Sequence, residues 1–97
     1  MDVLRPKGLE THPGEAIVPW AKMQLTIARS ILDNPGGGLL FATQTIGQVK
    51  SGLRERDAAR WETVGSILDR AEDAAVRREF DLSSTLLDEA LGALEKG

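Results

Sequence analysis

The stretch from Asp57 to Leu94 constrains the fold most, because its apolar residues recur at steps of three and four. Its first half carries the row Trp61, Val64, Leu68, Ala71 and Ala75, widened by Ile67 and Ala74, and its second half carries Leu82, Leu86, Leu87, Ala90, Leu91 and Leu94. This period is that of an α-helix and not of a β-strand. The stretch therefore predicts two amphipathic helices that form a hairpin, with a tight corner at Phe80 and Asp81.

Polar residues at the ends of these helices predict where each begins. Asp57 is the expected N-cap of the first helix, since its carboxylate can accept from the free N–H groups of a first turn. The second helix has Asp81 or Ser83 as its cap, and the sequence allows either. Asp73 and Arg77 form an i,i+4 pair in the favourable order.

The hairpin resembles a single tetratricopeptide-type helical hairpin between Ile67 and Leu91. The residues that carry the resemblance are Ala71, Phe80, Ser83, Leu87, Ala90 and Leu91, at the small and apolar positions of that motif. Glu79 departs from the pattern, because a turn-forming residue usually stands there. The chain also has no second copy, whereas solenoid repeats normally need about three units. The resemblance implies a helical hairpin.

A further helix is predicted to begin between Glu15 and Trp20 and to end at Asn34. Pro19 is tolerated in a first turn, and Pro35 with the following glycines ends the helix. Two adjacent apolar rows lie along it, namely Trp20, Met23, Ile27 and Ile31 beside Ala21, Leu25, Ala28 and Leu32. Together they form a face wider than one neighbouring helix usually covers.

The segment from Leu39 to Leu53 fits a helix or a short strand almost equally well. Its apolar residues follow a helical row, and Thr45 with Gln48 resembles a capping box for a helix that starts at Ile46. Threonines and glycines would also suit a strand. A lone strand would have no partner in this chain, so we predict a helix.

Length and composition place the chain among small globular proteins. Its 97 residues make one domain, which we expect to comprise an irregular arm over 1–14 and a helical domain over 15–97. The fold class predicted is all-α, a small bundle of three or four helices with a C-terminal helical hairpin. The absence of cysteine excludes disulfides and thiolate metal sites. No apolar run reaches the length of a membrane span, so a cytoplasmic protein is expected. The composition suggests a bacterial or phage source.

Residues able to carry out chemistry are sparse. The run Gly36–Gly38 lacks the Lys-Ser/Thr pair of a phosphate-binding loop, so we predict a connector. His12 is the only histidine; no serine or cysteine is placed to act as its nucleophile, and one histidine cannot build a typical metal site. The carboxylates of Asp69, Asp73, Asp88 and Glu89 are expected on solvated faces. We therefore predict no catalytic, cofactor-binding or metal-binding residues, and no enzyme.

Surplus apolar surface favours binding to another protein. The candidate interface comprises Trp20, Met23, Ile27, Ile31, Trp61 and Val64, and a homodimer is expected. The predicted function is a non-enzymatic protein–protein interaction module, such as an adaptor, a small chaperone or an inhibitor. One alternative is a small nucleic-acid-binding transcriptional regulator that uses the basic residues Lys50, Arg54, Arg56 and Arg60 on phosphate. Another is an accessory subunit of a larger complex, such as one encoded by a phage or mobile element.

Overall fold

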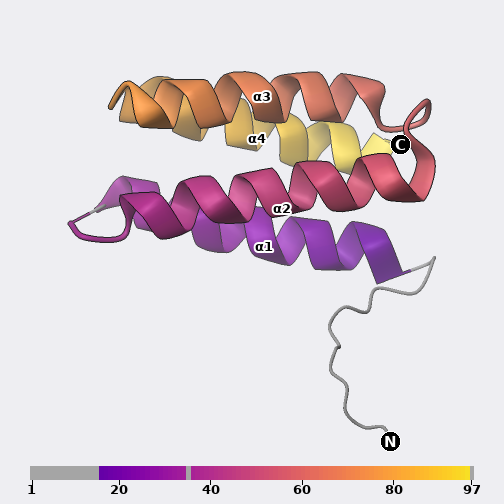
Figure 1. Cartoon of the computed structure of the whole chain (residues 1–97), viewed down its shortest axis with the longest axis horizontal. Coiled ribbons are helices and arrows are strands. Elements are labelled where there is room, and N and C mark those ends of the chain that lie inside the picture. The colour runs from indigo at the N-terminus through magenta and orange to yellow at the C-terminus, as the bar shows by residue number, and fades with distance from the viewer. Residues whose placement is uncertain (1–15, 35, 97) are drawn as a thin grey trace, which may run out of the picture.

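The computed structural model describes residues 16–34 and 36–96, and four α-helices account for most of them (Figure 1). They are α1 (Ile17–Asp33), α2 (Leu39–Asp57), α3 (Glu62–Val76) and α4 (Phe80–Lys96). Each helix runs antiparallel to the next, and α4 returns to lie beside α1, so the four helices close into a bundle. The described residues contain no strand, which confirms the all-α prediction. The predicted arm over 1–14, including His12, lies outside the described residues.

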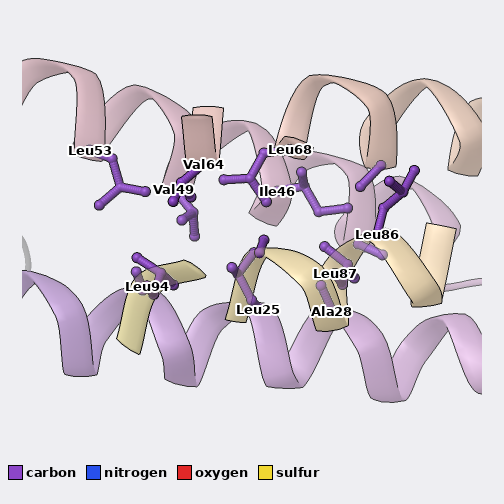
Figure 2. Close-up of a cluster of buried hydrophobic side chains, with 14 of the residues drawn as sticks. Leu25, Ala28, Ile46, Val49, Leu53, Val64, Leu68, Leu86, Leu87 and Leu94 are labelled. Atoms are coloured by element: carbon purple, nitrogen blue, oxygen red, sulfur yellow. The ribbon is translucent and has the colours of Figure 1, made fainter. Parts of the chain in front are cut away.

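The core is made of one apolar row from each helix (Figure 2). In α1 the buried row is the inner one of the two predicted, and its members Ala21, Leu25, Ala28 and Leu32 expose 2% of their surface or less. Opposite them lie Ile46, Val49 and Leu53 of α2, Val64 and Leu68 of α3, and Leu86, Leu87 and Leu94 of α4. Alanines in the buried rows allow the helices to approach closely, so leucines from neighbouring helices can fill the space between them.

Helix α2 contains the segment from Leu39 to Leu53, whose sequence fitted a helix or a strand almost equally well. The helix begins at Leu39, with Gly38 in the N-cap position, and Ala42 donates its N–H to the Gly38 carbonyl at 2.9 Å. The prediction of a helix is therefore confirmed. The predicted capping box is wrong, because Thr45 lies inside the helix and is buried. Because α2 begins at Leu39, its buried row includes Ala42. Burial of this row stabilises the helix more than a cap at Thr45 would.

The corner between α2 and α3 differs from the prediction. Asp57 ends α2 and does not cap α3, which begins at Glu62. Its carboxylate instead accepts from the Arg60 N–H at 3.1 Å inside the turn. The turn places Trp61 in the core, where it is 1% exposed and its indole Nε1 has no hydrogen-bond partner. The guanidinium of Arg60 lies 4.4 Å from the centroid of this ring. Burial of the large Trp61 ring therefore accounts for a turn over residues 58–61, where the sequence predicted the first turn of a helix capped by Asp57.

A Schellman motif ends α3. The Glu79 N–H donates to the Ala74 carbonyl at 2.8 Å, and the Arg78 N–H donates to the Ala75 carbonyl at 3.0 Å. This motif requires a left-handed residue, and Arg78 supplies it with a φ of 65°. Glycine usually takes that position because a side chain there is strained. The hairpin corner is therefore stabilised by backbone hydrogen bonds and strained at one residue.

Helix α4 begins earlier than predicted. It starts at Phe80, so neither Asp81 nor Ser83 is its cap; Ser83 donates its N–H to the Glu79 carbonyl at 2.9 Å and is itself buried. Leu82, expected in the core, is 47% exposed. The reason is the register of α4, whose buried row runs through Ser83 and the leucines and alanine that follow it at helical steps. That row turns Leu82 outward.

Candidate functional site: the uncharged face of α1 and α2

Charged residues are distributed unevenly over the bundle. Only three lie between Ala16 and Val49, whereas nineteen lie between Lys50 and Lys96. The bundle therefore has one layer, made of α1 and the first three turns of α2, that is nearly free of charge. The other layer, made of α3 and α4, lies on the opposite side of the bundle (Figure 1) and carries most of the charge.

The three charged side chains of α1 are held in ion pairs along its α4 side. The Lys22 ammonium lies 3.0 Å from a carboxylate oxygen of Glu95. The Arg29 guanidinium contacts Asp88 at 2.7 Å and Asp33 at 3.5 Å. The hydrogen bond to Asp88 and the charge of that carboxylate raise the pKa of Arg29. These pairs leave the outward side of α1 without charge.

The outer apolar row of α1 lies on this uncharged side. Met23 is 56% exposed and Ile27 is 42% exposed, so both present much of their side chains to solvent. Trp20 and Ile31 flank them and are half-buried, because each packs against the edge of the core. Met23 and Ile27 lie on either side of the midpoint of α1, so the apolar stripe occupies the middle of the helix.

Helix α2 extends this surface. Lys50 faces α3, with which it forms ion pairs, so Phe41, Gln44 and Gln48, which share another row, lie away from α3. Phe41 is 56% exposed in the first turn of α2, and the short connection places this turn beside the last turn of α1 (Figure 1). We define the uncharged face as Trp20, Met23, Ile27, Ile31, Phe41, Gln44 and Gln48.

Four of the six residues predicted to form an interface belong to the uncharged face, namely Trp20, Met23, Ile27 and Ile31. The other two, Trp61 and Val64, lie in the core at the corner between α2 and α3, where neither offers a surface to a partner. Sequence reasoning missed Phe41. The available signal was the uncharged run from Leu39 to Val49, which becomes informative only when this segment is treated as a helix.

Two of the basic residues proposed for phosphate binding, Lys50 and Arg54, form ion pairs with acidic residues of α3. Lys50 contacts Asp69 at 2.5 Å and Glu72 at 3.2 Å, and Arg54 contacts Asp69 at 3.2 Å. The hydrogen bond between Lys50 and Asp69 raises the pKa of the lysine and lowers the pKa of the aspartate. Lys50 and Arg54 therefore link α2 to α3, which reduces the positive charge available to a phosphate.

A shallow hollow of about 150 Å³ lies at the corner between α3 and α4, lined by Arg70, Asp73, Ala74, Arg77, Glu79, Leu82 and Leu86. Asp73 and Arg77 pair with each other there, as the sequence predicted. Across residues 16–34 and 36–96, no group of three or more His, Asp or Glu side chains is placed to hold a metal ion.

None of the described helices is both long enough and apolar enough to cross a membrane. Compared with models of protein families, with curated proteins and with solved structures, the chain matches none. The tetratricopeptide-like hairpin therefore remains a resemblance of sequence pattern, and the uncharged face must be interpreted from its own chemistry.

Proposed function

We propose that this chain is a non-enzymatic protein–protein interaction module that binds its partner on the uncharged face. The observation that carries the proposal is the exposure of Met23, Ile27 and Phe41 on a surface from which the charged side chains are directed away. Exposed apolar side chains lose the free energy that burial would give, and contiguous patches of them usually mark interfaces.

The composition of the uncharged face also suits a protein partner. The buried centres of protein interfaces are depleted of charge and enriched in methionine and aromatic residues. Here Met23 and Phe41 supply those side chains, while Gln44 and Gln48 are exposed amides that can form hydrogen bonds at a polar rim. An apolar centre with an uncharged polar border favours a protein surface over a charged ligand.

Nucleic acid is a less well supported partner. Binding to phosphate needs several unpaired cations, and Lys50 and Arg54 already pair with acidic residues of α3. The net charge of −3 also opposes general attraction to a polyanion. An accessory subunit of a larger complex would use the same uncharged face and is one form of the proposed module.

The proposal is tested by comparing two variants in affinity capture from an extract of the source cells, followed by mass spectrometry. Met23→Glu/Ile27→Glu places charge in the middle of the face. Val76→Glu is the matched control, because Val76 is an apolar residue of α3 that is 63% exposed and lies outside the face. Wild type and Val76→Glu should capture the same protein, and the double variant should lose it while keeping the helical circular dichroism spectrum. Capture that is equal for all three proteins, or absent for wild type, would overturn the proposal.

A further inference from the structure

We infer that a second copy of this chain occupies the uncharged face, which gives a two-fold dimer with the α1–α2 layers packed against each other. The inference rests on the proposed function, since it assigns a partner to the same docking surface. In this dimer the parts of each layer that carry little charge, namely α1 and the first three turns of α2, lie in the middle. The two charged α3–α4 layers lie outside in contact with water. This arrangement explains why charge is distributed unevenly between the two layers of one bundle.

The lack of charge makes this face suited to pairing with itself. A two-fold interface brings the same patch of both subunits together, so a charge near the axis would meet its own copy. Like charges in that position would be costly to bring together. The charges of Lys22 and Arg29 are instead paired along the α4 side of α1, away from the outer row. Methionine, isoleucine and phenylalanine side chains can meet their own copies without such a cost.

The size of the layer is close to what a stable dimer needs. Helix α1 has 17 residues and is therefore about 25 Å long, with a diameter of about 10 Å including side chains. Adding the neighbouring part of α2 gives a footprint of roughly 500 Å², and the corrugation made by side chains increases the accessible area beyond that value. Stable interfaces bury about 600–1,000 Å² per partner. The layer as a whole therefore approaches this range, whereas the outer row of α1 alone does not.

The position of the exposed residues predicts where the axis lies. Met23 and Ile27 lie on either side of the midpoint of α1 and are the exposed large hydrophobic side chains of that helix. An axis that passes between them places the two α1 helices across each other at their centres. Each Ile27 then lies near its own copy and near the methionine of the other subunit.

The chain has no cysteine, so single cysteines can report on this arrangement directly. Ile27→Cys should form a disulfide-linked dimer rapidly under mild oxidation, whereas Val76→Cys, on the charged layer, should form one slowly or not at all. Multi-angle light scattering of the wild type should give twice the chain mass of 10.5 kDa. The Met23→Glu/Ile27→Glu variant should give the mass of one chain. A wild type that is monomeric throughout a concentration series, or a dimer in which Ile27→Cys links no faster than Val76→Cys, would overturn the inference.

The dimer and the proposed function can fail separately. A monomeric wild type that still captures a different protein through the uncharged face overturns the dimer and supports the proposed function. A dimer linked at Ile27→Cys, with no capture of a different protein that depends on the face, supports the dimer and overturns the broader function. Failure of both measurements rejects the uncharged face as a docking surface.

Discussion

Ser83 of α4 donates a hydrogen bond from its Oγ to the carbonyl oxygen of Ala71 in α3 at 2.8 Å, and neither residue is exposed to solvent. Both residues are small, so the two helix backbones approach closely at this point. The hydroxyl satisfies its donor on a backbone acceptor of the neighbouring helix, which makes burial of a polar side chain tolerable. The contact also fixes the register of α4 against α3.

The loss of stability on substituting Ser83 should be greater when the new side chain is larger. Ser83→Ala removes one hydrogen bond and should lower the free energy of unfolding by about 1 kcal/mol or less. Ser83→Leu must enlarge a packed seam and should cost about 1–3 kcal/mol or more. Urea denaturation followed by circular dichroism measures both values. Ser66→Leu, at an exposed position of α3, is the matched control and should have little effect; an equal cost at both positions would contradict the packing described.

Two leucines of α4 should respond differently to the same change. Leu87→Asp buries an unpaired carboxylate in the core, where Leu87 is fully buried, and this should unfold the domain or remove most of its stability. Leu82→Asp changes a residue that is 47% exposed and should leave the helices intact. Leu68→Asp should act like Leu87→Asp. Thermal melts followed by circular dichroism separate these outcomes, and a sharp melt of Leu87→Asp at the wild-type temperature would contradict the assigned core.

Arg78→Gly should stabilise the protein. Arg78 has a φ of 65°, a left-handed conformation that costs a residue with a side chain about 1–2 kcal/mol relative to glycine. Glycine loses more conformational entropy on folding, so we expect a net gain of up to about 1 kcal/mol. Arg77→Gly, one residue earlier and with a negative φ of −82°, is the control and should destabilise. Equal losses at both positions would show that the strain at Arg78 is unimportant.

The glycines between α1 and α2 should differ in their tolerance of alanine. Gly36 has a φ of 47°, so Gly36→Ala should cost about 1 kcal/mol. A Cβ at Gly37 would meet nothing within 4 Å, so Gly37→Ala should change the melting temperature little. A nucleotide that raised the melting temperature of wild type but not of Gly37→Ala would contradict the view of this segment as a connector.

The ion pair between Lys50 and Asp69 predicts a pH dependence of stability. Hydrogen bonding to Lys50 lowers the pKa of Asp69, so the aspartate contributes stability above its unfolded pKa of about 3.9. That contribution is lost as the pH falls through the lower pKa of the folded state. The raised pKa of Lys50 acts in the opposite sense, since its contribution is present below about pH 10 and is lost as the pH rises through the folded value.

Asp69→Asn tests this pair. The Asp69 side chain is 48% exposed, and solvent screening limits the expected loss at neutral pH to less than about 1 kcal/mol. Urea midpoints measured from neutral pH to about pH 3 should fall less steeply for Asp69→Asn than for wild type. Glu89→Gln, which neutralises an exposed carboxylate of α4, provides the control for loss of one charge. An unchanged acid slope in Asp69→Asn would contradict the prediction.

Apolar periodicity predicted the helices and most of the core without tertiary information. The rows through Leu25, Leu68 and Leu87 recur at helical steps, and burying one side of each helix is sufficient to form a bundle. The same helical period identified the outer apolar row of α1, because two adjacent apolar rows are wider than the surface that one neighbouring helix covers. It also predicted the i,i+4 pair of Asp73 and Arg77, which depends only on spacing within one helix.

Other features depend on which helices pack together, and only the tertiary structure decided them. Periodicity could not show that Leu82 faces outward, since its exposure follows from the register in which Ser83 meets Ala71 across two helices. Nor could local signals at Asp57 and Thr45 place the helix ends, because burial of Trp61 and Ala42 outweighed the caps available there. The uncharged face likewise needs α1 and α2 to lie side by side. Contacts between residues distant in sequence select among locally similar alternatives, and a linear pattern does not contain them.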